Sequence, residues 1–373
     1  MSGKERGPFG GPERRAGSPA NCRASVRVAS TVLVAAAVAA VLLAGAGCSA
    51  STTTQSRTPD PATGVSQRTV RTVKLPYRGY GMARAVGSAL YVTVDSGNGL
   101  IDTLIKYDLG TEKSSTLVTV PADIAWVTVN EKWLLWESEK KLYAEPVGGG
   151  ARQVLATSRE AYGPALEGDT AAWVDHEEGA DPRIVTFNLK TREKREIART
   201  RVAEFYNNFM QLKDGKLLWT DIYDGTGHFV EHDLATAKTR DYAMPAIRFR
   251  YPGYAVRSGD SVYSINFDRY DQWEWGTQQV GRYSLATGGF KPVSKIGGYV
   301  NALVVGQNAI AVIDSEQRLL VGPADGSYPG SDLSATRGVK VDGIQVSADG
   351  ITAVAGRSVP ESAETTLFIF ELR

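Results

Sequence analysis

Apolar residues recur in short runs along the chain, and most of these runs end in a carboxylate. Clear copies end at Asp95, Glu137, Asp175 and Asp221, and weaker copies end at Asp268 and Asp314. A seventh run, residues 351–355, has Arg357 near the acidic position. The copies follow one another at about 40 to 50 residues, a period typical of repeat proteins with four strands per unit. The pattern predicts an all-β fold, a β-propeller with seven blades.

A second β-rich segment and a turn come after each of these runs. In the fourth unit this order predicts strands at 208–212, 217–221, 228–234 and 239–242, with a loop at 222–227. Asp214-Gly215 predicts a tight hairpin between the first two strands, because both residues tolerate positive φ. Each blade is therefore expected to be a four-stranded antiparallel sheet.

The seventh unit is one strand short at its C-terminal end. Residues 68–75 alternate polar and apolar side chains and precede the first complete unit, so they offer the missing strand. An N-terminal strand that completes the last blade closes the ring and removes two exposed sheet edges. We expect the propeller to span residues 68–373 and to close in this way.

Most of the aromatic and acidic residues in the repeat have a structural interpretation. Trp126, Trp133, Trp136, Trp173 and Trp219 fall in the first or second strand of their units, and we expect them to pack between neighbouring blades. The carboxylates at the strand ends are expected to accept hydrogen bonds from the adjoining loops.

Residues 1–47 have the order of a secretory signal, with basic residues, an apolar run at 28–46 and then small residues. Gly47-Cys48-Ser49 resembles the lipobox of bacterial lipoproteins, which implies that Cys48 is acylated (palmitate or a similar chain) and begins the mature protein. That family places Leu where this chain has Gly45. The alternative is an uncleaved single-pass anchor, since this run of 19 mostly apolar residues just suffices to span a bilayer.

Residues 48–67 begin with the lipidated Cys48, are rich in Ser, Thr, Pro and Gln, and are expected to form a flexible tether. The other cysteine, Cys22, lies in the signal segment, so the exported part would contain no disulfide. Loss of residues 1–47 would leave 36 basic and 39 acidic residues of the original 42 and 41, a net charge of −3. This balance argues against a nucleic-acid partner.

The fourth unit, from Leu217-Leu218-Trp219-Thr220-Asp221 through Asp224-Gly225 to residues 229–234, resembles the repeat of TolB-like (WD40-like) propellers. The Ser-Pro-Asp-Gly element typical of the first hairpin in that family is reduced here to Lys213-Asp214-Gly215. The resemblance extends loosely over residues 76–373. It implies an exported propeller that binds proteins or envelope components, and it brings no catalytic residues.

The loop after the second strand of the fifth unit, residues 268–276, is the first candidate for a recognition element. It is long and aromatic, a composition suited to protein or sugar binding, although its tryptophans could also fold back over the ring. The candidate binding residues on this face of the ring, with neighbouring loops included, are Asp268, Arg269, Tyr270, Asp271, Trp273, Glu274, Trp275, His176, Asp224 and His228.

No metal or cofactor is expected from the sequence. The three histidines lack the spacing of a ligand motif, and the Asp95 to Asp102 segment lacks the closing Glu of an EF-hand, so a plain hairpin loop is favoured there over calcium binding.

Two functions fit the sequence. The first is a scaffold, anchored by lipid to the outer face of the cell membrane, that binds an envelope or extracellular protein or a glycan. The second is a glycan hydrolase or lyase that uses carboxylates at the channel mouth, such as Asp175, Asp221 and Asp268. Their regular recurrence favours the scaffold, since catalytic groups should break the repeat.

Overall fold

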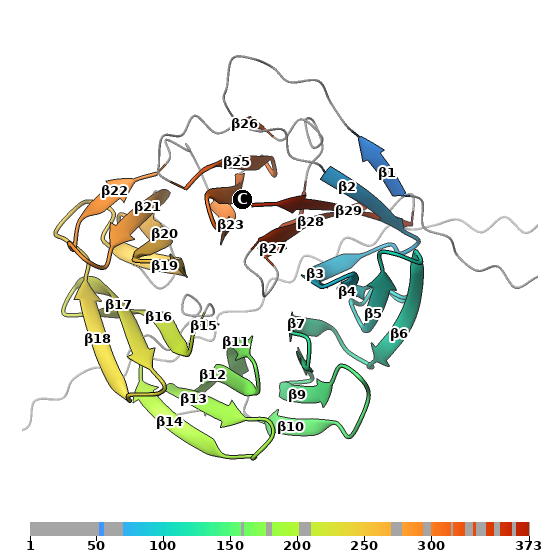
Figure 1. Cartoon of the computed structure of the whole chain (residues 1–373), viewed down its shortest axis with the longest axis horizontal. Helices are drawn as coiled ribbons and strands as arrows, with labels where there is room; N and C mark the ends of the chain where they lie inside the picture. Colours follow the sequence, from blue (N-terminus) through green and yellow to red (C-terminus); the bar gives the residue numbers. More distant parts are fainter. Residues whose placement is uncertain are drawn as a thin grey trace, which may run out of the picture. The chain divides into compact units, whose positions relative to one another are not determined.

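The computed structural model describes residues 52–55, 70–157, 160–176, 181–200, 210–269, 278–293, 300–314, 316–324, 331–332, 341–346, 351–359 and 363–372. All regular secondary structure in these ranges is β-strand, arranged as seven sheets around a common centre (Figure 1). The described part of the chain therefore contains no helix that could cross a membrane. The predicted seven-bladed propeller of antiparallel sheets is confirmed.

Six blades consist of four consecutive antiparallel strands. Blade one has β3 (Tyr80–Val86), β4 (Ala89–Val94), β5 (Thr103–Asp108) and β6 (Lys113–Thr119). Blade two has β7 (Ile124–Val129), β8 (Trp133–Ser138), β9 (Lys141–Pro146) and β10 (Gln153–Ala156). Blade three has β11 (Glu160–Glu167), β12 (Thr170–His176), β13 (Arg183–Asn188) and β14 (Lys194–Arg199).

The next three blades repeat this order. Blade four has β15 (Gln211–Lys213), β16 (Lys216–Tyr223), β17 (Thr226–Asp233) and β18 (Lys238–Ala243). Blade five has β19 (Tyr251–Ser258), β20 (Ser261–Phe267), β21 (Gln278–Ser284) and β22 (Phe290–Pro292). Blade six has β23 (Val300–Val305), β24 (Ala309–Asp314), β25 (Leu319–Pro323) and β26 (Ser331–Asp332). The first strand of each blade contacts the first strand of the next, and β27 returns to β3.

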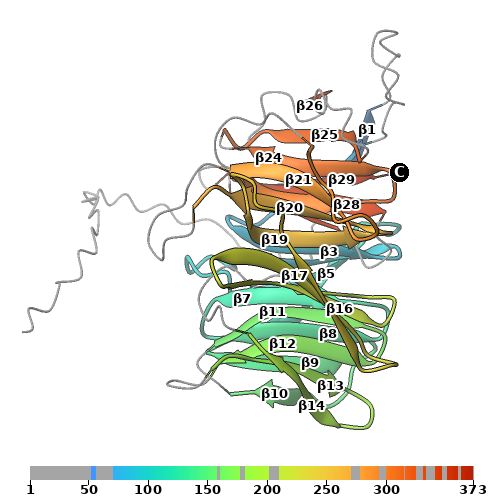
Figure 2. The ribbon, with the colours of Figure 1, turned by 90° about the vertical axis from the view of Figure 1, so that its left-hand side faces the viewer.

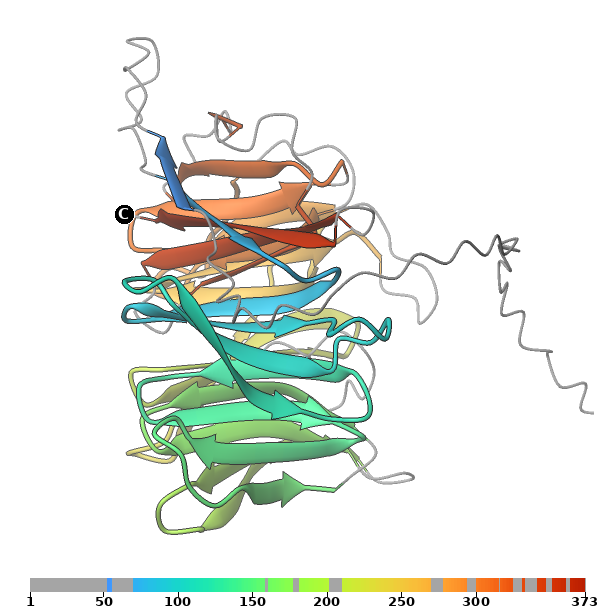
Figure 3. The same ribbon diagram turned by 90° about the vertical axis from the view of Figure 1, so that its right-hand side faces the viewer.

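Blade seven joins the two ends of the propeller. It contains β27 (Gly343–Val346), β28 (Thr352–Val359) and β29 (Glu364–Glu371), and β2 (Val70–Leu75) pairs antiparallel with β29. Figure 3 shows this blue N-terminal strand beside the red C-terminal strands. The predicted closure by an N-terminal strand is confirmed.

A further strand, β1 (Thr52–Gln55), pairs with the outer edge of β2. These four residues fall within the segment expected to be a tether. Three of them are threonines, whose branched Cβ favours extended backbone, and the free edge of β2 supplies the hydrogen-bonding partners. A short part of the segment therefore extends the sheet of blade seven.

The hairpins of blade four show where the sequence argument succeeds and where it fails. Asp214 and Gly215 both have positive φ (54° and 68°), and Lys213 pairs with Lys216 as predicted. The expected loop at 222–227 is wrong, because β16 and β17 pair as far as Tyr223 and Thr226. Asp224 and Gly225 form a second tight turn there, again with positive φ (52° and 69°).

The sheets lie in layers when the ring is seen from its side (Figure 2). The hydrophobic core consists of separate clusters of buried side chains between neighbouring sheets. Trp136, Trp173 and Trp219 are buried in such clusters, as predicted. Trp133 is partly buried and donates its indole N–H to Asp169 (2.9 Å). The layered clusters explain why aromatic residues recur with the period of the blades.

The carboxylates that end the second strands do not share one role. Asp95 accepts the backbone N–H groups of Gly97 and Gly99, and Asp314 accepts those of Glu316 and Arg318, as predicted for loop-stabilising groups. Asp175 departs from this pattern and forms ion pairs with Lys194 and Arg183. The repeated acidic position is therefore largely part of the scaffold.

Candidate functional site

A cavity of about 430 Å³ lies at the centre of the ring. The first strands of all seven blades line it, mainly through their C-terminal halves and the adjoining hairpin turns. Two lining residues at these turns, Glu131 and Lys213, are exposed, so the cavity opens on the face that carries the turns. This is the face opposite to the loops that the sequence favoured. The volume of the cavity is within the range of small-molecule binding sites.

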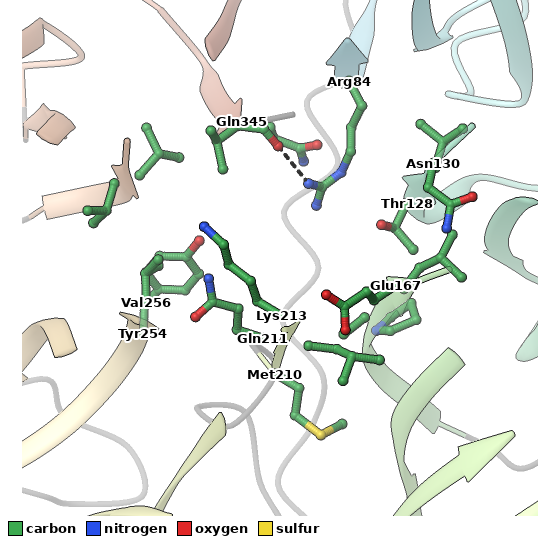
Figure 4. A pocket seen from close by; sticks show the side chains of 18 of the residues that line it. Arg84, Thr128, Asn130, Glu167, Met210, Gln211, Lys213, Tyr254, Val256 and Gln345 are labelled. Carbon is green, nitrogen blue, oxygen red and sulfur yellow. Dashed lines mark hydrogen bonds between the residues drawn. The ribbon is translucent and has the colours of Figure 1, made fainter. Parts of the chain in front are cut away.

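Arg84, from β3, places a guanidinium group in this cavity (Figure 4). Its Nε donates to the Val127 carbonyl oxygen (3.3 Å) and its Nη1 donates to the Val346 carbonyl oxygen (3.0 Å). The side chain thus joins blade one to blades two and seven. Both N–H groups of Nη2 lack a hydrogen-bond partner within the described residues.

The Arg84 charge has no carboxylate partner within 4.0 Å among the described residues. Burial is the main influence on the group and lowers the pKa of Arg84, and the hydroxyls of Tyr254 and Tyr80 oppose this shift weakly. Burial also raises the pKa of Tyr254, which lines the same cavity, so this phenol stays neutral. An arginine remains charged in such surroundings, so the cavity holds a cation without a direct carboxylate partner among the described residues.

Two further polar side chains are directed into the same space in Figure 4. The Lys213 ammonium group has no ion-pair or hydrogen-bond partner in the described part of the chain. The buried Oε1 of Gln345 also lacks a hydrogen-bond partner there. Unsatisfied buried polar atoms are uncommon in folded proteins, so Gln345 marks a place where a further group can bind.

Other polar lining residues are committed to the scaffold. The Glu167 carboxylate accepts the backbone N–H groups of Asp214 (2.5 Å) and Gly215 (2.8 Å), which fixes the turn of blade four against blade three. Asn130 donates to the Gly168 carbonyl oxygen (2.9 Å). Gln211 accepts the backbone N–H of Arg257 (2.6 Å). Each oxygen of the Glu167 carboxylate thus accepts one backbone N–H, and Glu167 and Glu131 contribute two negative charges to the lining beside the positive charges of Arg84 and Lys213.

The fifth-blade residues proposed from the sequence lie on the other face of the ring. Asp268 comes directly after β20 and accepts two hydrogen bonds from Arg248 (3.1 and 2.9 Å) on the connection that enters blade five. Arg269 is exposed. Tyr270, Asp271, Trp273, Glu274 and Trp275 lie outside the described residues, so their part in binding stays a prediction.

The neighbouring candidates occupy different positions within blades three and four. His176 is the last residue of β12, and Asp224 is exposed in the tight turn between β16 and β17. His228 is buried, stacks on Tyr223 (3.7 Å between ring centroids), and its Nδ1 lies 2.7 Å from the Asp241 carboxylate. Burial lowers the pKa of His228, with Asp224 opposing this, so the imidazole is held inside the sheet in its neutral form.

No group of three His, Cys, Asp or Glu side chains capable of holding a metal ion occurs among the described residues. In the Asp95 to Asp102 segment, the Asp102 carboxylate accepts hydrogen bonds from Ser96, Asn98 and Thr103. These donors hold the pKa of Asp102 below its usual value, although burial opposes them. The loop is therefore organised by its own hydrogen bonds.

The three carboxylates considered for glycan cleavage do not line the cavity. Asp175 forms ion pairs with Lys194 (2.9 Å) and Arg183 (3.7 Å), and Asp268 pairs with Arg248. The buried Asp221 accepts the N–H of the next residue, Ile222 (3.0 Å). Each of the three carboxylates therefore has a structural bond within the described part of the chain.

No protein-family model and no curated protein matches the sequence. The solved structures that resemble the chain include the WD40 domain of Pan2 from Neurospora crassa (8% identity, TM-score 0.54, covering 78% of this chain and 88% of that one). An oligogalacturonate lyase in complex with manganese is 11% identical (TM-score 0.54, 87% and 96% covered). TolB from Acinetobacter baumannii is 13% identical (TM-score 0.46, 78% of each chain). At such identities the likeness shows the propeller fold, and function has to be argued from the site.

A further sequence signal near the cavity lies in the first strands of the blades and not in their loops. Gly81-Met82-Ala83, Gly163-Pro164-Ala165 and Gly253-Tyr254-Ala255 form a Gly-x-Ala repeat in the first strands of blades one, three and five. Each coincides with a β-bulge where the register of that strand shifts. Bulges redirect side chains, and Arg84 comes directly after the first of them.

Proposed function

We propose that the protein is an exported, lipid-anchored β-propeller that acts as a binding scaffold at the cell envelope. The central cavity is the observation that carries this proposal. Arg84 brings unused N–H donors into the cavity and has no direct carboxylate partner among the described residues, whereas Asp175 and Asp268 of the repeat form ion pairs outside the cavity lining. Such a lining suits the binding of a ligand. The lipobox-like Cys48 supports the anchor.

Acylation of Cys48 is the first expected result. Cells that express the chain and are fed an alkyne fatty acid should label the wild type, while Cys48→Ser should lose the label completely. Cys22→Ser is the matched control, because this cysteine belongs to the segment that export removes, and it should keep full labelling. Equal labelling of wild type and Cys48→Ser would contradict the anchor.

Partner binding through the fifth-blade loop is the second expected result. A pull-down from membranes with wild type should recover proteins that are lost with a variant in which Tyr270, Trp273 and Trp275 are all Ala, provided the variant keeps its thermal unfolding midpoint. Aromatic residues at protein interfaces often contribute about 2 kcal/mol or more each, which predicts a loss beyond a factor of ten. Identical partners would refute this loop, and turnover of glycans by the purified protein would refute the scaffold.

A further inference from the structure

The cation at the centre of the ring calls for an anionic ligand. Arg84 uses two N–H groups on backbone carbonyls and keeps both N–H groups of Nη2, and no described carboxylate oxygen lies within 4.0 Å of it, although Glu131 and Glu167 line the same cavity. Carbonyl oxygens solvate a guanidinium group partially and do not cancel its charge. A planar guanidinium binds a carboxylate with good geometry, because two N–H groups match its two oxygens.

The symmetry of the ring supports a special role for Arg84. Blade five has the same hairpin geometry as blade one, and Val256 occupies the equivalent position, two residues before the last paired residue of the first strand. Val256 also lines the cavity. An apolar residue therefore suffices for the scaffold at this position, and a charged residue there departs from the repeat.

The surroundings of Arg84 define what else the ligand must offer. Lys213 adds a second cation at the open end of the cavity, and the Gln345 amide adds an unused hydrogen-bonding group in either orientation of its O and N atoms. The remaining wall combines polar residues, such as Thr128 and Asn130, with apolar side chains from five blades: Leu166, Met210, Leu212, Val256, Leu303, Val304 and Ile344. Such a wall favours a ligand with an apolar body.

We propose that the central cavity binds a small organic acid, with its carboxylate on Arg84 and its apolar body against the aliphatic wall. The inference rests on the proposed binding function and names the chemical class of one ligand. Inorganic anions are disfavoured because they leave the apolar wall uncovered. A purely structural role for Arg84 is disfavoured because Nη2 makes no hydrogen bond with the described residues.

The test is isothermal titration calorimetry on the full chain, purified in detergent, at low ionic strength. The probes are 3-phenylpropionate, its neutral amide 3-phenylpropanamide, and inorganic phosphate. Wild type should bind the acid at least about tenfold more tightly than either other probe, because a charge-assisted hydrogen bond is lost with the amide and the apolar contact is lost with phosphate.

Variants locate the site. Arg84→Gln should weaken binding of 3-phenylpropionate by about tenfold to a hundredfold. Lys213→Glu, at an exposed position without a partner in the described chain, should weaken it severalfold and serves if Arg84→Gln fails to fold. Arg199→Gln is the matched control, because this exposed arginine lies on the outer strand β14 and pairs with Glu196. It should bind as wild type does.

Each outcome decides the question. Equal affinity for the acid and the amide, preference for phosphate, no binding by wild type, or full binding by a folded Arg84→Gln variant would overturn the inference. These results leave the scaffold proposal standing if acylation and partner capture are observed. If acylation and partner capture both fail while acid binding is retained, the envelope-scaffold proposal is refuted and the cavity site is supported.

Discussion

Replacing Val73 with Asp is expected to destabilise the whole propeller by about 4 kcal/mol or more. Val73 is fully buried in β2, pairs with Leu367 of β29 and belongs to the cluster between blades seven and one. A carboxylate there would be buried without a partner, which is among the costliest single changes in a core. Because β2 closes the ring, its loss exposes one edge of β29 and weakens the packing on blade one.

Chemical unfolding followed by circular dichroism measures this effect. Lys74→Gln is the matched control, because the neighbouring residue of the same strand is exposed and its ion pair with Glu364 is solvent-accessible. Such pairs contribute at most about 1 kcal/mol, so the control should stay close to wild type. A Val73→Asp variant with the unfolding midpoint of the control would show that β2 does not hold the ring together.

The second large effect is expected from Arg257→Met, at about 3 kcal/mol or more. Glu231 of β17 is buried and forms an ion pair with Arg257 of β19, which joins blades four and five. The Lys216 ammonium group lies 4.0 Å from Glu231, and the exposed Arg240 pairs opposite Glu231 in the sheet. Removing Arg257 leaves the carboxylate buried with poor compensation, and breaking buried pairs in this way typically costs about 3 to 5 kcal/mol.

A double variant, Arg257→Met with Glu231→Met, separates the ion pair from the packing. It should recover most of the lost stability, because two apolar side chains of similar volume replace the pair without leaving a buried charge. The matched control is Arg195→Met, whose pair with Glu193 is exposed, and its unfolding free energy should change by less than about 1 kcal/mol. If the double variant is as unstable as the single one, shape and not charge explains the role of Arg257.

Most of the fold could be predicted from the sequence because its strands are short, regular and separated by turns of definite chemistry. The hairpin at Asp214-Gly215 and the pairing of residues 70–75 with the last strand result from local backbone preference and from the need to cover sheet edges. The loop predicted at 222–227 is absent, because β16 and β17 continue to pair there and a second Asp-Gly turn joins them. The number of residues between two predicted strands does not reveal how far those strands continue to pair.

The cavity could not be predicted in the same way. Loops stand out in the sequence because their length and composition vary from blade to blade. Arg84 lies in a strand between two alanines, and no feature of this sequence indicates that its side chain enters the central cavity. Only the closed ring brings it beside carbonyl groups of Val127 and Val346, which are 43 and 262 residues away. The bulge at Gly81 contributes to its direction, and a bulge is visible in the pairing register but not in a hydrophobicity pattern.

The pairing of β2 with β29 in blade seven also determines when the propeller can finish folding. Lys74 and Glu364, bonded across the blade, are separated by 290 residues, so the sheet cannot form until nearly the whole chain has been synthesised. Blades one to six are built from consecutive strands and can form in order as the chain emerges. The slow step is therefore expected to be the last one, when a loop spanning the entire propeller closes. Until then β29 and β2 are open edges, and the protein is most exposed to aggregation in that interval.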